Sequence, residues 1–268
     1  MTDAERRAAL EEIAGEVRVC TRCRLHETRT KAVPGEGDPS TEVVFVGEGP
    51  GMNEDREGRP FVGRAGGLLV NLLGHIGWSR EDVFITNIVK CRPPGNRDPE
   101  PDEIAACAPY LERQLATLDP SVVVTLGRHS MGRFMPGMRI SQAHGTTRVA
   151  DPATGARDAT VFAMYHPAAA LRTPGIERES YEDVALIPTV LTDARARRAE
   201  ARRAARAGGA APIAASASAE TPDAEPVSAD AAPQAEPLTA DRIVPAAQPT
   251  SAAALPDTEP AADQLSLF

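Results

Sequence analysis

Short hydrophobic runs alternate along the chain with segments of helical periodicity. Four runs are rich in β-branched and aromatic residues and are bounded by Gly or Pro, which is typical of strands buried on both faces. They cover residues 42–47, 83–89, 121–127 and 160–165. Apolar residues at helical spacing cover residues 3–18, 64–77, 101–118, 128–135 and 177–207. This order predicts an α/β fold, a three-layer α/β/α sandwich around a central, mainly parallel four-stranded sheet.

The composition changes sharply near residue 208. From there the chain is mostly Ala, Pro, Ser, Thr, Asp and Glu, so it cannot bury enough apolar surface to offset the entropy of ordering. We expect a folded domain at residues 1–207, a disordered linker at 208–263 and a short terminal peptide at 264–268. Residues 211–268 hold nine acidic side chains and one Arg, so this tail supplies −8 of the formal net charge of −9. The acidity of the whole chain therefore does not exclude binding of nucleic acid by the domain.

Basic side chains are grouped along the domain, which predicts a patchy basic surface. They are Arg56, Arg59, Arg64, Lys90, Arg92, Arg97, Arg172 and the six arginines between Arg195 and Arg206. No stretch approaches the roughly 20 apolar residues that span a bilayer, so we expect no membrane association and a cytoplasmic location. In that reducing compartment cysteines serve as metal ligands or buried residues rather than as disulfides.

All four cysteines can belong to one ligand set. Cys20 and Cys23 form a short chelating pair, Cys91 follows after 67 intervening residues, and Cys107 follows after 15 more. Structural zinc and a [4Fe–4S] cluster both accept four thiolates with one such pair. The spacing alone leaves both open and slightly favours zinc.

Polar or Gly-rich residues follow three of the predicted strands. The turn GEGPG occupies residues 47–51, Asn87 ends the second strand, and His166 follows the fourth. Ligands of open parallel sheets bind beyond the carboxyl ends of the strands, so we expect these three segments to line one crevice. The glycines let another molecule approach the backbone closely.

Three longer segments resemble the family 4 uracil-DNA glycosylases, the iron–sulfur branch of the uracil-DNA glycosylase superfamily. They are GEGPGMNEDREGRPFVGRAGGLL, ITNIVKCRPPGNRDPEPDEIAAC and MYHPAAALR. The resemblance covers roughly residues 8–190. It implies a hydrolase that flips uracil out of DNA and cuts its N-glycosidic bond, which starts base excision repair. It also turns the choice of metal to a structural [4Fe–4S] cluster on Cys20, Cys23, Cys91 and Cys107.

The resemblance implies how the base is recognised. Phe61 is the stacking residue, in a loop that we expect to be exposed, and the Asn87 amide offers the acceptor and the donor that match the edge of uracil. Glu54 stands where a pocket wall would exclude the methyl group of thymine by a clash. The implied pocket comprises Gly47, Gly49, Pro50, Gly51, Glu54, Phe61 and Asn87.

The same resemblance implies how the reaction proceeds. His166 stabilises charge that develops on uracil O2. Gly49 stands where the better-known branch of the superfamily has an Asp for the water, so Glu48 and Asn96 remain two candidates to position it. We favour a dissociative course, in which a strong base matters less. Leu171 can wedge into the duplex and Arg172 can hold a phosphate.

The last five residues resemble the bacterial sliding-clamp binding motif. They are Gln264, Leu265, Ser266, Leu267 and Phe268. A short apolar anchor on a flexible tether is typical of docking peptides. We therefore expect uracil-containing DNA and the sliding clamp as partners of a monomeric, nucleoid-associated enzyme.

Two other functions remain as alternatives. One is a family 5-like glycosylase that acts on a wider range of damaged bases. The other is a non-catalytic, clamp-tethered DNA-binding protein. Excision assays distinguish all three.

Overall fold

The computed structural model describes residues 1–208. The predicted linker at 208–263, apart from Gly208, and the predicted docking peptide at 264–268 lie outside the described residues. None of the helices within residues 1–208 combines the length and the apolar character that a bilayer crossing requires.

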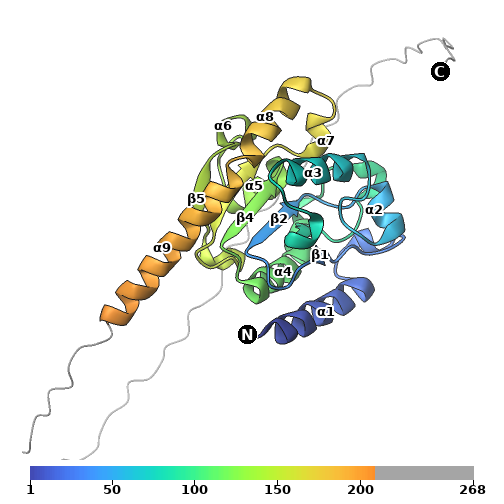
Figure 1. Ribbon diagram of the computed structural model, residues 1–268. Helices are drawn as coiled ribbons and strands as arrows, with labels where there is room; N and C mark the ends of the chain where they lie inside the picture. Colours follow the sequence, from blue (N-terminus) through green and yellow to red (C-terminus); the bar gives the residue numbers. More distant parts are fainter. Residues whose placement is uncertain (209–268) are drawn as a thin grey trace, which may run out of the picture. The chain divides into compact units, whose positions relative to one another are not determined.

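The core of the domain is one six-stranded sheet with the strand order β1-β3-β2-β4-β6-β5 (Figure 1). Its strands are β1 (Glu36–Gly37), β2 (Val43–Gly47), β3 (Phe84–Asn87), β4 (Val122–Leu126), β5 (Thr147–Val149) and β6 (Thr160–Met164). The four predicted strands are β3, β2, β4 and β6, and they pair in parallel. The α/β fold with a mainly parallel sheet is therefore confirmed.

The two edge strands were not predicted, and both pair antiparallel to their neighbours. β1 has two residues, and β5 exposes all three of its residues. Neither contains the buried apolar run that identifies a strand in a sequence. The sheet consequently has two more strands than the four expected.

Helices cover both faces of the sheet. Their bounds are α1 (Asp3–Val19), α2 (Met52–Glu57), α3 (Arg64–His75), α4 (Pro101–Leu118), α5 (Arg128–Phe134), α6 (Ile140–Ala143), α7 (Pro167–Ala170), α8 (Pro174–Val184) and α9 (Ile187–Gly208). Short 3-10 turns lie at Arg24–His26, Arg80–Asp82, Pro94–Asn96 and Pro152–Thr154. The alternation along β2 separates the faces, because Val44 and Val46 pack in one apolar cluster while Val43 and Phe45 pack in the other.

Each apolar cluster contains its own set of helices, which gives the three layers. The first cluster takes in the buried side chains of α1, α4 and α5, and the second takes in those of α3, α7, α8 and α9. The α1–α4 contact and the α3–α7–α8 group are visible on their respective sides of the strands (Figure 1). The predicted α/β/α sandwich is thus the observed arrangement.

The helix predicted over residues 177–207 is instead two helices. α8 ends at Val184 and α9 begins at Ile187. Pro188 lies in the first turn of α9, where its missing N–H costs nothing, but it disfavours continuation of a helix from the residues before it. The short helix α2 was also not predicted, because its six residues are mostly polar.

The carboxyl ends of the four parallel strands meet at one edge of the sheet. Gly47 pairs with Asn87 at the ends of β2 and β3, and Leu126 pairs with Met164 at the ends of β4 and β6. The GEGPG turn, Asn87 and the segment that begins at His166 therefore converge, as predicted.

Candidate active site

An open pocket of about 650 Å³ lies beyond these strand ends. It is lined by every predicted pocket and catalytic residue except Gly47, together with the predicted DNA-binding residue Arg172. The lining also includes residues that the sequence analysis did not single out. These are Ala65, Pro93, Asp98, Arg128, Ile140, Tyr165, Ala168 and Ala169. Arg97, which was predicted only as part of the basic surface, lines the pocket as well.

Asn87 lines this pocket and has an unpaired amide oxygen. Its side chain is 2 % exposed, and its Oδ1 has no hydrogen-bond partner. Gly47 lies against it, because a Cβ atom at residue 47 would come within 2.4 Å of Asn87 Oδ1 and 2.6 Å of Phe61 Cζ. A buried acceptor without a hydrogen bond lowers the stability of the fold. Such an acceptor is typical of a site where a ligand supplies the missing donor.

Phe61 is buried rather than exposed, contrary to the prediction for its loop. It is 6 % exposed, packs in the second apolar cluster and lines the pocket. Its φ of 50° lies in the left-handed region, which few residues other than Gly adopt. Arg80 Nη1 donates to the Phe61 carbonyl at 2.8 Å, and Gly66 allows close approach of the loop, since a Cβ there would lie 1.9 Å from the same oxygen.

His166 is held in one tautomer by the helix that it caps. The Ala168 N–H donates to His166 Nδ1 at 3.1 Å, so the proton of the neutral ring is on Nε2. Burial and the positive charge of Arg172, opposed by Glu54, together lower the pKa of His166 to about 4. The ring centroids of Phe61 and His166 are 5.8 Å apart. A neutral hydrogen-bond donor therefore lies beside the aromatic residue in the pocket.

Glu54 ties together the two loops on either side of α2. Its carboxylate accepts hydrogen bonds from the backbone N–H groups of Gly51 at 3.1 Å and of Val62 and Gly63 at 2.9 Å each. Three such bonds fix a carboxylate firmly. The side chain is therefore a rigid part of the pocket wall.

The other predicted residues differ in how they are engaged. Asn96 is exposed and its Oδ1 already accepts a hydrogen bond from Arg92 Nε at 2.7 Å. Leu171 is half-buried, packs against the second apolar cluster and does not line the pocket, so it is not a free wedge in this conformation. Arg172 is exposed and lines the pocket.

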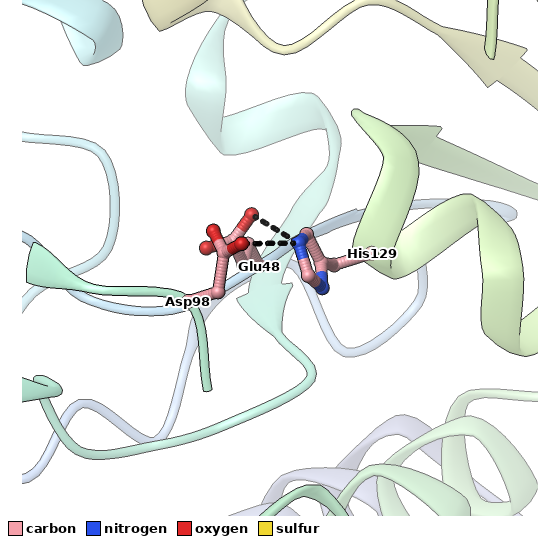
Figure 2. A group of neighbouring side chains, drawn as sticks. All are labelled: Glu48, Asp98 and His129. Atoms are coloured by element: carbon pink, nitrogen blue, oxygen red, sulfur yellow. Dashed lines mark ion pairs between the residues drawn. The ribbon is translucent and has the colours of Figure 1, made fainter. Parts of the chain in front are cut away.

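Glu48 belongs to a group of ionisable residues that the sequence analysis missed in part. Figure 2 shows its carboxylate facing His129 and Asp98. His129 Nε2 lies 3.9 Å from Glu48 Oε2 and 3.4 Å from Asp98 Oδ2. Burial raises the pKa of Glu48 above its usual value, Asp98 adds to the increase, and His129 and Arg128 oppose it. His129 follows the third parallel strand by three residues, so the strand-end argument indicates its edge of the sheet but not its contacts with Glu48 and Asp98.

One predicted basic surface residue is buried. Lys90 is 1 % exposed, and its Nζ donates to Thr86 Oγ1 at 2.6 Å, to the Asn87 carbonyl at 2.8 Å and to Gln114 Oε1 at 2.7 Å. Burial lowers the pKa of Lys90 to about 7. Lys90 therefore holds the end of β3, and the interpretation of it as a surface cation was wrong.

All four cysteine side chains line a second cavity, which is enclosed by α1, α4 and the turn at Arg24–His26. None forms a disulfide. A tetrahedral zinc ion with Zn–S bonds of about 2.3 Å holds its sulfur atoms about 3.8 Å apart. Among the described residues, the compact group of possible ligands within 4.8 Å is Glu48, Asp98 and His129, and no three of the thiols form one. The donor set therefore fits a larger group better than a single zinc ion.

Cations surround the cysteine cavity. Arg22, Arg29 and Lys90 line it, Arg29 Nη1 donates to Cys91 Sγ at 3.1 Å, and the Lys90 N–H donates to Cys107 Sγ at 3.2 Å. Burial raises the pKa of the Cys107 thiol to about 11. Such a thiol loses its proton only when a metal ion takes its place. The cations and N–H donors fit four thiolates that bind a metal group.

Glu103 joins the cysteine region to the pocket. Its fully buried carboxylate accepts hydrogen bonds from Arg97, which lines the pocket, and from Arg24, which follows Cys23. The Arg97 guanidinium and these further bonds, against the effect of burial, hold the pKa of Glu103 at about 2. Glu103 thereby links two parts of the segment between Cys91 and Cys107 to each other and to Arg24.

Comparisons with known proteins identify the family. Residues 34–187 match the family model of the uracil DNA glycosylase superfamily. The type-4 uracil-DNA glycosylase of Sulfurisphaera tokodaii is 50% identical over 181 residues, which cover 65% of this chain and 81% of the relative. That of Saccharolobus solfataricus is 49% identical over 187 residues, 68% and 87% of the two chains. The type-5 uracil-DNA glycosylase of Thermus thermophilus is 36% identical over 154 residues, 51% and 68%.

Proposed function

Because this chain belongs to the uracil-DNA glycosylase superfamily and is a type 4 enzyme that excises uracil from DNA, we propose that Asn87, Phe61 and His166 recognise the flipped base. The observation that carries this assignment is the buried, unpaired Oδ1 of Asn87 at the pocket. A base inside a duplex cannot reach such a pocket, so the nucleotide must leave the stack.

Asn87, Phe61 and Glu54 have separate roles in base recognition. Asn87 Oδ1 accepts from uracil N3–H while its NH₂ group donates to O4, and cytosine lacks this donor and acceptor pattern. Phe61 stacks on the face of the base. Glu54, fixed by its three backbone hydrogen bonds, serves in the pocket wall against the methyl group of thymine.

The bond between uracil N1 and the sugar C1′ then breaks, and its electron pair leaves with the base. His166 Nε2–H donates to O2, where negative charge develops, and its neutral state suits this role. A water oxygen adds to C1′ and gives one proton to a base, while the uracil anion takes a proton from solvent. Glu48 is the better candidate for this base, because it is half-buried and accepts no side-chain hydrogen bond among the described residues, whereas Asn96 is bound to Arg92.

A panel of substrates tests this function. Excision should occur from uracil-containing single-stranded or double-stranded oligonucleotides and should be weak or absent on hypoxanthine and xanthine. Comparable activity on all three bases would favour the family 5-like alternative, and no activity in a protein with its metal group intact would favour the DNA-binding alternative. The higher identity to type-4 relatives supports uracil as the substrate.

We also propose that Cys20, Cys23, Cys91 and Cys107 hold a [4Fe–4S] cluster. When bound, the cluster supplies a covalent crosslink between distant segments and is open to electron transfer. The fit of the thiols and of the surrounding cations supports this proposal.

The purified protein should accordingly contain iron and acid-labile sulfide in equal amounts and little zinc. Cys107→Ser should lose most of the iron and should lower the free energy of unfolding by several kcal/mol, because it removes a buried ligand. Metal analysis together with thermal unfolding measures both effects. One zinc per chain and no sulfide would overturn the assignment.

The final five residues are proposed to bind the sliding clamp. A linker of about 55 residues has a root-mean-square reach of roughly 40 Å, which lets the domain sample DNA near the clamp. DNA as the substrate also supports a cytoplasmic, nucleoid-associated monomer. This part of the proposal rests on the sequence motif alone.

Deletion of residues 264–268 should abolish co-elution with the clamp and leave excision of uracil from a short free oligonucleotide unchanged. Excision should be unchanged because the proposed docking peptide is separate from the catalytic pocket. A Gln264→Ala, Leu267→Ala variant provides a full-length comparison. Equal binding of the clamp by the shortened chain would contradict the prediction.

A further inference from the structure

Three neighbouring strands bring Glu48, Asp98 and His129 together beside the pocket, which Glu48 and Asp98 line. Glu48 follows β2, Asp98 lies in the loop after β3, and His129 lies in the first turn of α5 after β4. Figure 2 shows the imidazole on one side and the two carboxylates on the other. The side chain of His129 is 21% exposed and that of Glu48 is 30% exposed, so water screens this group only in part.

We infer that His129 and Asp98 are positioning residues that set the orientation and the charge of Glu48 for its contact with the attacking water. This inference rests on the proposed function and deepens it. Glu48 has no side-chain hydrogen bond to hold its carboxylate within the described part of the chain, and its ionisable neighbours within 4.8 Å are His129 and Asp98. A catalytic group must be held within a narrow range of orientations, and charged neighbours in a half-buried site can do so.

The hydrogen bond from Arg128 to His129 depends on the protonation state of the imidazole. Arg128 Nε donates to His129 Nε2 at 2.9 Å, and its guanidinium also binds Asp98. Because an arginine only donates, this bond requires a neutral imidazole with an unprotonated Nε2. When the ring takes up a proton, Nε2–H instead faces Asp98 and Glu48. The Arg128 side chain is 65% exposed, so water surrounds much of it.

The two neighbours of Glu48 act in opposite directions. Burial is the main cause of the raised pKa of Glu48; a protonated His129 opposes the increase, and the negative charge of Asp98 adds to it. Other charged or titratable groups also line this pocket from other segments, namely Glu54, Arg97, Tyr165, His166 and Arg172. These groups are the same in His129→Gln and in Asp98→Asn, so a difference between the pH profiles of the two variants reports on His129 and Asp98.

The test is the pH dependence of the single-turnover rate on a uracil-containing single-stranded oligonucleotide. His129→Gln should move the acid limb upward by about one pH unit, which is about a tenfold slower rate on that limb. Asp98→Asn should move it downward. Asp98→Glu retains the charge and should stay near the wild type. Glu48→Gln should abolish the limb.

Matched controls separate these shifts from general effects. His75→Gln and Asp193→Asn change the same residue types at exposed positions outside the pocket and should leave the profile unchanged. Thermal unfolding shows that each variant is folded. An unmoved limb in His129→Gln and Asp98→Asn, or shifts in the same direction, would overturn the inference while the wild type remains active. Lack of excision by the wild type would instead overturn the proposed function.

Discussion

Asn87→Ala should excise uracil about 10²- to 10³-fold more slowly than the wild type in single turnover, because the site loses both hydrogen bonds to the edge of the base. The substitution should lower base binding and the rate of excision without lowering the stability of the fold. The amide Oδ1 has no partner in the protein, so its removal leaves no other group unpaired and should leave the free energy of unfolding nearly unchanged. Rapid-quench assays with excess enzyme measure the rate.

Asn71→Ala is a suitable control for this experiment. Asn71 is exposed on α3 and lies outside the pocket lining, so its removal should change neither the rate nor the stability. A rate for Asn87→Ala within a factor of about three of the wild type would show that the amide does not read the base.

His166→Ala should also lower the rate by about 10²- to 10³-fold, since it removes a donor aimed at the leaving base. The pKa of His166 is lowered to about 4, below the usual value of 6.5, so its ring stays neutral at every pH above about 5. Titration of His166 should therefore add no limb to the rate profile near pH 6.5. His166→Gln, which retains a donor, should recover part of the rate.

The same shift has a consequence for stability, and its sign follows from linkage. The pKa is lower in the folded protein than in the unfolded chain, so the contribution of His166 to stability is fully present above pH 6.5. It is lost as the pH falls from 6.5 toward about 4. The wild type should therefore lose more stability than His166→Gln over this range in urea unfolding. Parallel loss in both proteins would contradict the lowered pKa.

The sequence predicted those parts of the fold that depend on long apolar patterns. The four parallel strands were found because each is a short run of mostly apolar residues that is buried on both faces, and α4 was found with its bounds. The edge strand β5 was missed because its residues are exposed, and the break between α8 and α9 was missed because the apolar spacing continues across it. A pattern of apolar residues predicts neither an exposed edge strand nor a break between two helices with continuous apolar spacing.

The site residues predicted from the strand pattern are those that lie at or just beyond the end of a strand and carry a side chain able to hydrogen-bond uracil. Asn87 and His166 are of this kind. His129 and Asp98 were missed because their relation to Glu48 exists only between segments, at distances that no local pattern encodes. Lys90 was misread because a lysine in a sequence usually indicates a surface, whereas here Thr86 and Gln114 satisfy its ammonium group inside the core.

The backbone at Gly47 also limits how far this enzyme can be re-engineered. Enzyme pockets are commonly widened by replacing a large side chain with a smaller one, but the pocket-lining residues Asn87 and Phe61 are backed by the main chain of Gly47. A glycine has no side chain left to remove. Acceptance of a bulkier base at this depth would require the end of β2 itself to move, and the parallel pairing of Gly47 with Asn87 opposes that movement. Laboratory evolution toward larger lesions should therefore find its useful changes at the rim of the pocket rather than at its floor.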